Sequence, residues 1–302
     1  MADNASSDDS VAFVRNRFPS VGIIETGDNL GFAGGYNAAL SDLTEEYFVL
    51  LNSDVEVCAN WLEPMLELMD SDPHVAVCQP KILQYNNRSH FEYAGAAGGF
   101  IDKFGFPFCR GRIFETCEED NGQYDQPTEI FWATGACMLV RSNVYRELGG
   151  LDADFFAHME EIDLCWRAKR SGRKIMAVPR SKVYHVGGGT LSKSNPKKTF
   201  LNFRNGLELL CKNLPASNLI QVMLVRMVFD GIAALKFLLS GHPKDFTAVF
   251  RAHMAFYGRL NVTLKKRQGN FNPVSKIYRN SIVIDHYLMR NNKFSDLAAD
   301  KF

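Results

Sequence analysis

Through the first two thirds of the chain, short apolar runs alternate with longer amphipathic runs, and this order favours an α/β fold. The run Tyr47–Leu51 is continuously apolar, as expected of a strand that is covered on both faces. The run Ala59–Asp70 has apolar residues at helical spacing and stops before Asp72 and Pro73. From Thr199 onward the strand signals fade, so we expect the C-terminal part to be helical.

The same periodicity and turn rules place the remaining elements. We expect strands at Val21–Ile24, Val75–Cys78, Gly135–Arg141, Ile175–Val178 and Lys182–His185. We expect helices at Gly34–Leu43 and Glu160–Ser171, and one that Ser142 caps and that ends at Gly149. The segment 84–126 is expected to form hairpins and loops. These elements predict an α/β domain over residues 1–198 and a basic helical region over residues 199–302.

Charge is distributed unevenly, although the whole chain is neutral with 34 basic and 34 acidic residues. The segment 197–302 holds 17 Lys and Arg against 6 Asp and Glu, a net charge of +11, and the first 196 residues carry −11. Such asymmetry predicts a basic region that meets an anionic surface or ligand, and we expect a membrane surface rather than a nucleic acid. In the alternative interpretation, the two parts neutralise each other across an internal interface.

One long apolar run, Leu219–Leu239, is interrupted by Arg226, Asp230 and Lys236. On a helix these charged residues fall within an arc of about 120°, which predicts an amphipathic helix in a membrane interface or against the α/β domain. A buried core helix is nearly as compatible with the pattern, whereas three central charges argue against a membrane span.

Composition also bears on the cellular compartment. The chain has 46% apolar and 23% charged residues, values typical of a folded protein. Its seven cysteines contain no C-x-x-C pair, so they fit neither a disulfide framework nor a structural zinc site and favour a reducing compartment. The first ten residues have neither the basic nor the apolar stretch of a secretory signal. We therefore expect a cytoplasmic protein.

Two candidate metal ligands follow predicted strands. Asp54 comes shortly after Tyr47–Leu51, at the edge where open α/β sheets bind ligands. A carboxylate there can hold Mg²⁺ or Mn²⁺, which in turn neutralises a diphosphate. His185 ends a predicted strand before three glycines and is a candidate ligand for a metal or a phosphate. In the structural alternative, Asp54 only ends a strand at a turn and His185 packs in the core.

Two further segments carry candidate functional groups. Asn29–Asn37 is rich in glycine and lies between a strand and a helix, where backbone N–H groups can approach a phosphate or ribose. A packing turn is the alternative. Glu160, Glu161 and Asp163 crowd a predicted helix start. Crowded carboxylates raise one another's pKa, which suits a general base, although acids at a helix start can simply compensate the helix dipole.

Taken together and in this order, these segments resemble the motifs of family 2 glycosyltransferases with the GT-A fold, in particular the bacterial rhamnosyltransferase-like branch. The matching segments are Asp3–Ser6, Asn29–Asn37, Leu51–Asp54, Gly135–Arg141, Phe155–Arg167 and Tyr184–Gly188. The resemblance covers roughly residues 2–205 and implies a Rossmann-like sheet. Family members begin with a strand, a helix and a second strand before the first motif, so we expect an N-terminally truncated version of the fold.

The resemblance also implies a donor site. The residues expected to bind a nucleotide diphosphate sugar are Asp3, Asn29, Gly31, Gly34, Asn37 and Asn52. Among them, Asp3 would contact the nucleotide base. Asp54 would hold the divalent metal, Mg²⁺ or Mn²⁺, as the last position of the family's D-x-D-type motif. His185 would complete the metal or diphosphate site.

The resemblance further implies how the reaction proceeds. Glu161 would deprotonate the acceptor hydroxyl in an inverting transfer, with Glu160 as the alternative base and Asp163 beside them. Trp132 and Gly135 would border the acceptor, a glycan or a lipid-linked sugar in cell-surface polysaccharide synthesis. The transferred sugar would be one such as rhamnose. A catalytically inactive docking subunit is the alternative, whereas a nucleotidyltransferase would need a glycine-rich basic signature that is absent.

Overall fold

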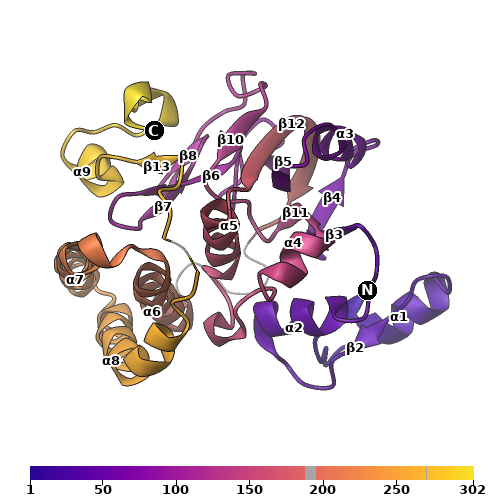
Figure 1. Cartoon of the computed structure of the whole chain (residues 1–302), viewed down its shortest axis with the longest axis horizontal. Coiled ribbons are helices and arrows are strands. Elements are labelled where there is room, and N and C mark those ends of the chain that lie inside the picture. Colours follow the sequence, from indigo (N-terminus) through magenta and orange to yellow (C-terminus); the bar gives the residue numbers. More distant parts are fainter. Residues whose placement is uncertain (188–194, 270) are drawn as a thin grey trace.

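The computed structural model describes residues 1–187, 195–269 and 271–302 and shows an α/β region beside a group of long helices (Figure 1). A six-stranded sheet has the order β10-β12-β5-β11-β3, with β4 also paired to β12. Its long strands β5 (Val75–Gln84) and β12 (Lys174–His185) run parallel to each other, and its other pairs are antiparallel. The other members are β3 (Tyr47–Leu51), β4 (Val55–Val57), β10 (Thr128–Ile130) and β11 (Cys137–Arg141).

Side chains that alternate along these strands bury both faces of the sheet. On β11, Met138 and Val140 join the main core, whereas Leu139 packs on the opposite face with Met65 and Met69 of α3 (Glu63–Ser71). The helices that contribute side chains to the main core include α2 (Gly31–Leu40), α4 (Ser142–Glu147) and α5 (Glu160–Arg170). This mixed α/β architecture confirms the predicted fold class.

A second sheet forms from the segment that the sequence predicted as hairpins and loops. Its order is β13-β6-β7-β8-β9. The strands are β6 (Gly99–Asp102), β7 (Pro107–Cys109), β8 (Arg112–Ile113), β9 (Thr116–Cys117) and β13 (Ile277–Tyr278). Because β13 pairs with β6 and the Phe302 ring packs against Phe100, the C-terminal region also completes this sheet and is not helical alone.

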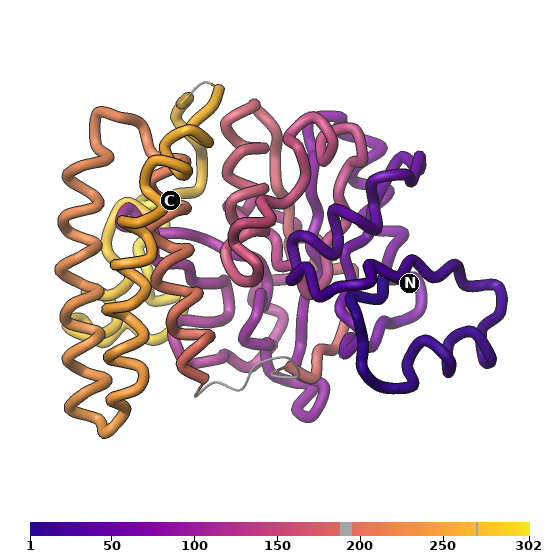
Figure 2. Tube along the Cα trace, turned by 90° about the horizontal axis from the view of Figure 1, so that it is seen from below, coloured from indigo at the N-terminus to yellow at the C-terminus, as the bar shows by residue number. Residues whose placement is uncertain are grey.

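The N-terminal segment projects from the α/β region (Figure 2). Its strands β1 (Ala2–Asp3) and β2 (Ile24–Glu25) form a separate two-stranded parallel sheet, and α1 (Ser10–Arg17) between them has no buried residue. The strand expected at Val21–Ile24 is thus shorter and begins at Ile24.

Three long helices of the C-terminal region lie side by side in Figure 2: α6 (Pro196–Asn213), α7 (Ala216–Leu239) and α8 (Pro243–Lys265). A short helix, α9 (Ile282–Tyr287), follows β13. Asn195 caps α6, since its side chain accepts a hydrogen bond from Lys197 N over 2.9 Å. Within the described ranges, no helix combines the length and the apolarity that crossing a membrane requires.

Ion pairs join these helices to the α/β region. Lys212 of α6 and Lys266, just after α8, each place Nζ 2.6 Å from a carboxylate oxygen of Asp152. Arg259 of α8 lies 2.9 Å from Asp154. Part of the charge asymmetry is therefore neutralised across an internal interface, as the alternative interpretation of the charge pattern predicted.

Some predicted helices and strands differ from those of the structure in their bounds or caps. The two strands expected at Ile175–Val178 and Lys182–His185 are one strand, β12, which continues through a register shift between them. The expected cap Ser142 lies inside α4, whose N-cap position is taken by Arg141 without a side-chain hydrogen bond. The helix expected to start at Gly34 starts three residues earlier, at Gly31.

Candidate active site

Asp54 and His185 meet where β3 and β12 end, although 131 residues separate them in sequence. His185 Nε2 lies 3.2 Å from Asp54 Oδ1. The antiparallel pairing of His185 with Val55 brings the turn after β3 against the end of β12. The His185 ring is buried, whereas Asp54 keeps 29% of its side chain exposed. A ligand can therefore reach this corner from the side of Asp54.

Glu92 approaches the second ring nitrogen of His185 and was not predicted from the sequence. Its Oε2 atom lies 3.2 Å from His185 Nδ1. Burial lowers the pKa of His185, but the carboxylates of Glu92 and Asp54 outweigh burial and raise it above the ordinary value. No motif distinguishes Glu92, since it lies in the segment expected to form hairpins and loops.

These groups fit a divalent cation. A carboxylate and an imidazole are suitable ligands for Mn²⁺, and Mg²⁺ sites often combine one or two carboxylates with substrate phosphates. Carboxylates such as Glu92 commonly orient metal-bound histidines. Within the described part of the chain, no group of three His, Cys, Asp or Glu side chains forms a metal cluster. Gly188, the last residue of the predicted histidine motif, lies outside the described residues.

Glu160 and Glu161 form an acidic pair at the start of α5. The Oε2 atom of each is buried and has no hydrogen-bond partner among the described residues. Burial, reinforced by the Glu161 carboxylate, raises the pKa of Glu160 well above its usual range. Burial raises the pKa of Glu161 to about 7. Because Glu161 also keeps part of its side chain accessible, it can accept a proton from a bound molecule near neutral pH.

Asp163, the third predicted carboxylate, has different surroundings. Its Oδ2 atom accepts from Arg167 Nε over 2.7 Å, and its Oδ1 atom accepts from Asn213 Nδ2 over 2.8 Å and lies 2.9 Å from Lys212 Nζ. Burial would raise the pKa of Asp163, but Arg167 and Lys212 outweigh burial and hold it well below its usual range. Asp163 therefore anchors α5 to α6, and its place beside the base stays a prediction.

The loop before α5 has an unusual backbone. Phe156, His158 and Met159 all have positive φ angles, a strained conformation for residues with side chains. Asn205 of α6 holds this loop, because its Nδ2 atom donates to the carbonyl oxygens of Ala157 over 2.9 Å and of His158 over 2.7 Å. Asn205 was not predicted as a site residue, and its position inside a helix carries no local signal.

The glycine-rich segment packs directly against this loop. Gly31 has a φ of +72°, and a Cβ atom there would lie 2.5 Å from the carbonyl oxygen of Phe156. Gly34 is also packed closely, since its Cβ would lie 2.8 Å from the Leu30 side chain. Asn29 Oδ1 accepts from Gly31 N over 3.0 Å, so this side chain shapes the turn.

Asp3 and Asn52, two other predicted donor-site residues, lie near chain turns. Asp3 is buried, and its Oδ1 atom has no hydrogen-bond partner among the described residues, although Oδ2 accepts from Ser6 N. Asn52 begins the turn that leads to Asp54, and its backbone N donates to Ala136 O over 3.0 Å. Asp3 thus has an acceptor oxygen left for a ligand.

Asn37 faces the protein instead of a nucleotide pocket. Its Nδ2 atom donates to Leu151 O over 2.6 Å, and its Oδ1 atom accepts from Tyr145 over 2.7 Å and from Leu151 N over 3.0 Å. The side chain therefore fastens α2 to the segment after α4. The predicted contact of Asn37 with the nucleotide sugar stays a prediction beside this structural role.

Trp132 and Gly135 are also parts of the core. Trp132 is 4% exposed, and its indole Nε1 donates to Phe100 O over 2.8 Å. A Cβ atom at Gly135 would lie 2.7 Å from the Phe32 ring. The ring of Trp132 is covered by the protein, and Gly135 supplies the space that Phe32 fills. That these two residues border the acceptor stays a prediction.

Comparison with known proteins identifies related sequences. A family model described as Glycosyl transferase family 2 matches residues 1–149. The N-acetylglucosaminyl-diphospho-decaprenol L-rhamnosyltransferase of Mycobacterium tuberculosis (strain CDC 1551 / Oshkosh) is 24% identical over 199 residues, which are 61% of this chain and 65% of that protein. The low-salt glycan biosynthesis hexosyltransferase Agl10 of Haloferax volcanii is 25% identical over 180 residues, 58% of this chain and 54% of that protein. The chain thus spans 54–65% of the length of these relatives.

A solved structure supports the fold. The crystal structure of GalNAc-T7 with UDP, GalNAc and Mn²⁺ is similar with a TM-score of 0.53 at 14% identity, over 71% of this chain and 41% of that one. At this identity the similarity establishes the fold alone. Together with the family model and the mycobacterial relative, it confirms the resemblance to family 2 and its rhamnosyltransferase-like branch that the motifs indicated.

Proposed function

Because this chain belongs to glycosyl transferase family 2, we propose that it transfers a sugar from a nucleotide diphosphate sugar to a hydroxyl group of a glycan or lipid-linked acceptor. The observation that carries the proposal is the pair Glu160 and Glu161 at the start of α5, with the pKa of Glu161 raised by burial to about 7. The mycobacterial relative is named a rhamnosyltransferase, so rhamnose is the first sugar to test. The proposed setting is surface-polysaccharide synthesis at the cytoplasmic face of a bacterial membrane.

In this proposal Glu161 is the base. The accessible part of its carboxylate accepts the proton of the acceptor hydroxyl while the hydroxyl oxygen attacks the anomeric carbon. The bond from the anomeric carbon to the diphosphate oxygen breaks, and the nucleoside diphosphate leaves with the electron pair. A single displacement of this kind inverts the anomeric configuration. Glu160 suits the role less well, because its side chain is buried, whereas that of Glu161 is partly accessible.

Asp54 and His185 are the proposed ligands of Mg²⁺ or Mn²⁺. When bound, the cation would neutralise negative charge on the donor diphosphate and on the leaving group. Glu92 lies on the Nδ1 side of His185 and would keep Nε2 directed toward Asp54. The crystallisation of GalNAc-T7 with UDP and Mn²⁺ supports this proposal.

The nucleotide is proposed to lie between the first strand and the glycine-rich turn. Asp3 offers a buried oxygen without a partner in the described chain, which suits a hydrogen bond from a nucleotide base. The turn through Asn29, Gly31 and Gly34 leads into α2, where backbone N–H groups favour ribose or diphosphate oxygens. Asn52 lies close to this edge, in the turn that leads to Asp54.

A membrane surface is the proposed partner of α7 and α8. Two of the three charged residues of α7 point inward: Arg226 and Asp230 are buried and pair over 2.8 Å, and Arg226 also donates to Gly105 O. The third, Lys236, is exposed. The outward face of α7 is apolar and consists of side chains that are more than half exposed, namely Ile220, Leu224, Val228, Ile232 and Leu235. Phe250 and Met254 extend the apolar surface over α8.

This arrangement is the reverse of a soluble amphipathic helix, in which charges face water. A contiguous apolar surface on the outside of a protein marks an interaction site. Basic residues of the C-terminal region would add attraction to anionic lipid. The amphipathic pattern of Leu219–Leu239 therefore supports peripheral membrane binding.

A transfer assay tests the proposal. The protein would be incubated with Mn²⁺, a set of nucleotide sugars including dTDP-rhamnose, and lipid-linked or free glycan acceptors. We expect release of nucleoside diphosphate together with a product of inverted anomeric configuration, measured by NMR. Glu161→Gln should lose transfer, whereas Glu63→Gln, an exposed matched change, should not. Retained configuration would contradict the mechanism, and donor binding without transfer to any acceptor would favour a docking subunit.

A further inference from the structure

A cavity of about 670 Å³ opens between the starts of α6 and α8 and the loop before α5. Four basic residues line it: Lys197 and Arg204 from α6, and Lys244 and Arg251 from α8. Phe156 and Phe200 supply aromatic walls. No acidic residue is among the described residues that line the cavity, so it is a basic pocket with partly apolar walls.

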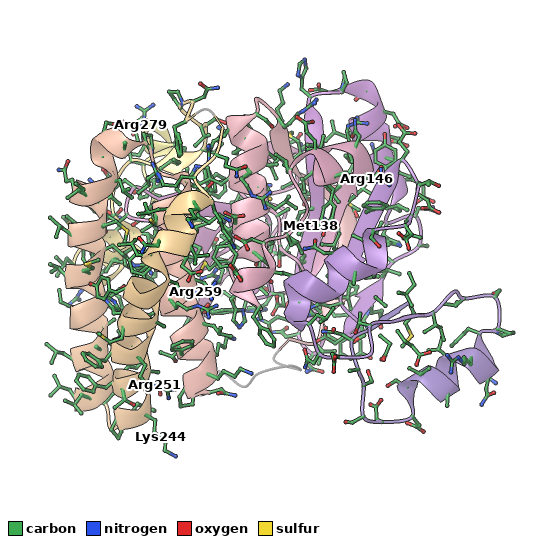
Figure 3. The ribbon with its side chains drawn as sticks, turned by 60° about the horizontal axis from the view of Figure 1, so that its bottom comes forward. Met138, Arg146, Lys244, Arg251, Arg259 and Arg279 are labelled. Carbon is green, nitrogen blue, oxygen red and sulfur yellow. The ribbon has the colours of Figure 1, made fainter. Side chains whose placement is uncertain are left out.

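The starts of α6 and α8 lie side by side at this pocket, because Thr199 Oγ1 donates to Asp245 Oδ1 over 2.6 Å. Asp245 is buried and directed to Thr199, and it does not line the cavity. Figure 3 shows Lys244 near one end of α8 and Arg251 farther along the same helix. Helix packing therefore holds Lys197, Lys244 and Arg251 around one pocket.

Most charges of the pocket lack counter-ions. Ion pairs hold Lys212, Arg259 and Lys266 elsewhere on the helices. In the described ranges, by contrast, no ion pair holds Lys197, Lys244 or Arg251; Lys197 Nζ lies 5.0 Å from the centroid of the Phe156 ring, and the Arg251 guanidinium lies 5.9 Å from that of Phe200.

Arg204 has an acidic neighbour, because its Nε atom lies 4.0 Å from Glu208 Oε1. Glu208 itself does not line the cavity. An anion with more than one negative charge would relieve the repulsion among these groups.

The pocket borders the loop that precedes the candidate base. Phe156 belongs both to its lining and to the strained loop before α5. Arg204 Nη2 donates to the carbonyl oxygens of Asp154 over 3.0 Å and of Phe155 over 3.1 Å. An anion on Arg204 would therefore lie close to the segment that places Glu161.

We propose that this pocket binds the diphosphate group of a prenyl-diphosphate-linked acceptor. The inference rests on the proposed transfer to a lipid-linked acceptor and names the part of the acceptor that is recognised. The donor diphosphate has a separate candidate site at Asp54 and His185. The exposed apolar side chain of Phe250, next to Arg251, favours a lipid diphosphate over a free one, because a prenyl chain can continue along α8.

Calorimetry with farnesyl diphosphate, a short soluble prenyl diphosphate, tests the inference. We expect saturable binding to the full chain without nucleotide, and at least tenfold weaker binding to Lys244→Glu and to Arg251→Glu. Lys265→Glu makes the same charge change at the exposed far end of α8 and should bind as the wild type does. Unchanged affinity in the two pocket variants would overturn the assignment.

Two further ligands separate the possible sources of the anion. Inorganic diphosphate should bind more weakly than farnesyl diphosphate, and equal affinity would show a free-phosphate site and overturn the lipid assignment. The affinity for a nucleoside diphosphate with Mn²⁺ should be the same in all variants, and its loss in the pocket variants would assign the pocket to the donor. Because these are binding measurements, the inference can fail while sugar transfer is observed, and transfer can fail while prenyl diphosphate binds.

Discussion

Asn205 Nδ2 donates a hydrogen bond to the carbonyl oxygen of His158 over 2.7 Å, and thereby a residue of the C-terminal helices holds the loop that begins the candidate catalytic helix. His158 and Met159 have positive φ angles, so the loop needs support from its surroundings. The C-terminal region consequently takes part in shaping the site that the family motifs define.

Replacing Asn205 with Ala should weaken both stability and turnover. The change leaves the carbonyl groups of Ala157 and His158 without their donor, which should lower the free energy of unfolding by roughly 1–3 kcal/mol. The turnover number should fall about tenfold or more while the KM for the donor is kept. Denaturant unfolding and steady-state kinetics check this, with the exposed Asn218→Ala as the control. Wild-type turnover in Asn205→Ala would show that the loop keeps its shape unaided.

Gly31 and Gly27 form a matched pair for testing how closely the glycine-rich segment packs. Both have positive φ angles, but a Cβ atom at Gly31 would meet the Phe156 backbone at 2.5 Å, whereas one at Gly27 would meet nothing within 4 Å. Gly27→Ala should cost about 1–2 kcal/mol of stability from backbone strain alone. Gly31→Ala should cost more and should also reduce turnover, because the loop must move. Equal losses of stability in the two variants, measured by thermal unfolding, would contradict the predicted clash at Gly31.

Glu161→Gln should lower turnover by roughly 10²–10⁴-fold while donor binding is preserved, since the amide cannot accept the proton. With the pKa of Glu161 near 7, wild-type turnover should fall as the pH is lowered below about 7. The Glu160 carboxylate also interacts with this group, so the midpoint of the profile belongs to the pair. A pH–rate profile checks the prediction. A larger loss in Glu160→Gln than in Glu161→Gln would exchange their roles.

The same pKa shift predicts a change in stability. Burial raises the pKa of Glu161 from an ordinary 4.5 to about 7, so the folded state holds the proton more tightly than the unfolded state. This contribution to stability is complete at low pH and is lost as the pH rises from about 4.5 through about 7. Above pH 7, Glu161→Gln should therefore be more stable than the wild type. If urea unfolding at pH 8 gives the two proteins the same free energy of unfolding, the Glu161 carboxylate is not a buried charge.

Asp54→Ala should abolish the Mn²⁺ dependence of nucleotide-sugar binding, because it removes a proposed oxygen ligand. Glu92→Gln should weaken metal-dependent binding about 10–100-fold, as expected when the partner of a metal-bound histidine is lost. Calorimetry with and without Mn²⁺ measures both effects, and the exposed Glu45→Ala is the control. If Asp54→Ala binds the donor with unchanged metal dependence, the metal assignment is wrong.

Leu224→Glu and Val228→Glu should weaken binding to vesicles that contain anionic lipid, because each places a charge on the outward face of α7. Both side chains are more than half exposed, so folding should be little affected. Phe13→Glu makes a comparable change on the projecting α1 and should leave co-sedimentation unchanged. Vesicle binding that ignores the α7 variants would contradict a membrane role for this face.

The sequence by itself determined the order of the elements and the places where polar groups follow strands. Periodicity and turn chemistry are local properties, so the predicted strand Tyr47–Leu51 coincides with β3 and the acidic helix begins at Glu160 as expected. The charge pattern of Leu219–Leu239 likewise predicted an amphipathic helix. The local pattern did not predict which face of this helix is buried.

Only the tertiary structure decided which predicted residues share a site. Glu92 and Asn205 were missed because their partners, His185 and the loop before α5, lie far away in the sequence. Asp163 and Glu161 carry the same functional group, but the first is neutralised by Lys212, whereas the Oε2 atom of the second is buried with no hydrogen-bond partner among the described residues. Burial and long-range ion pairs set the proton affinity of a carboxylate, and both arise only when distant segments pack together.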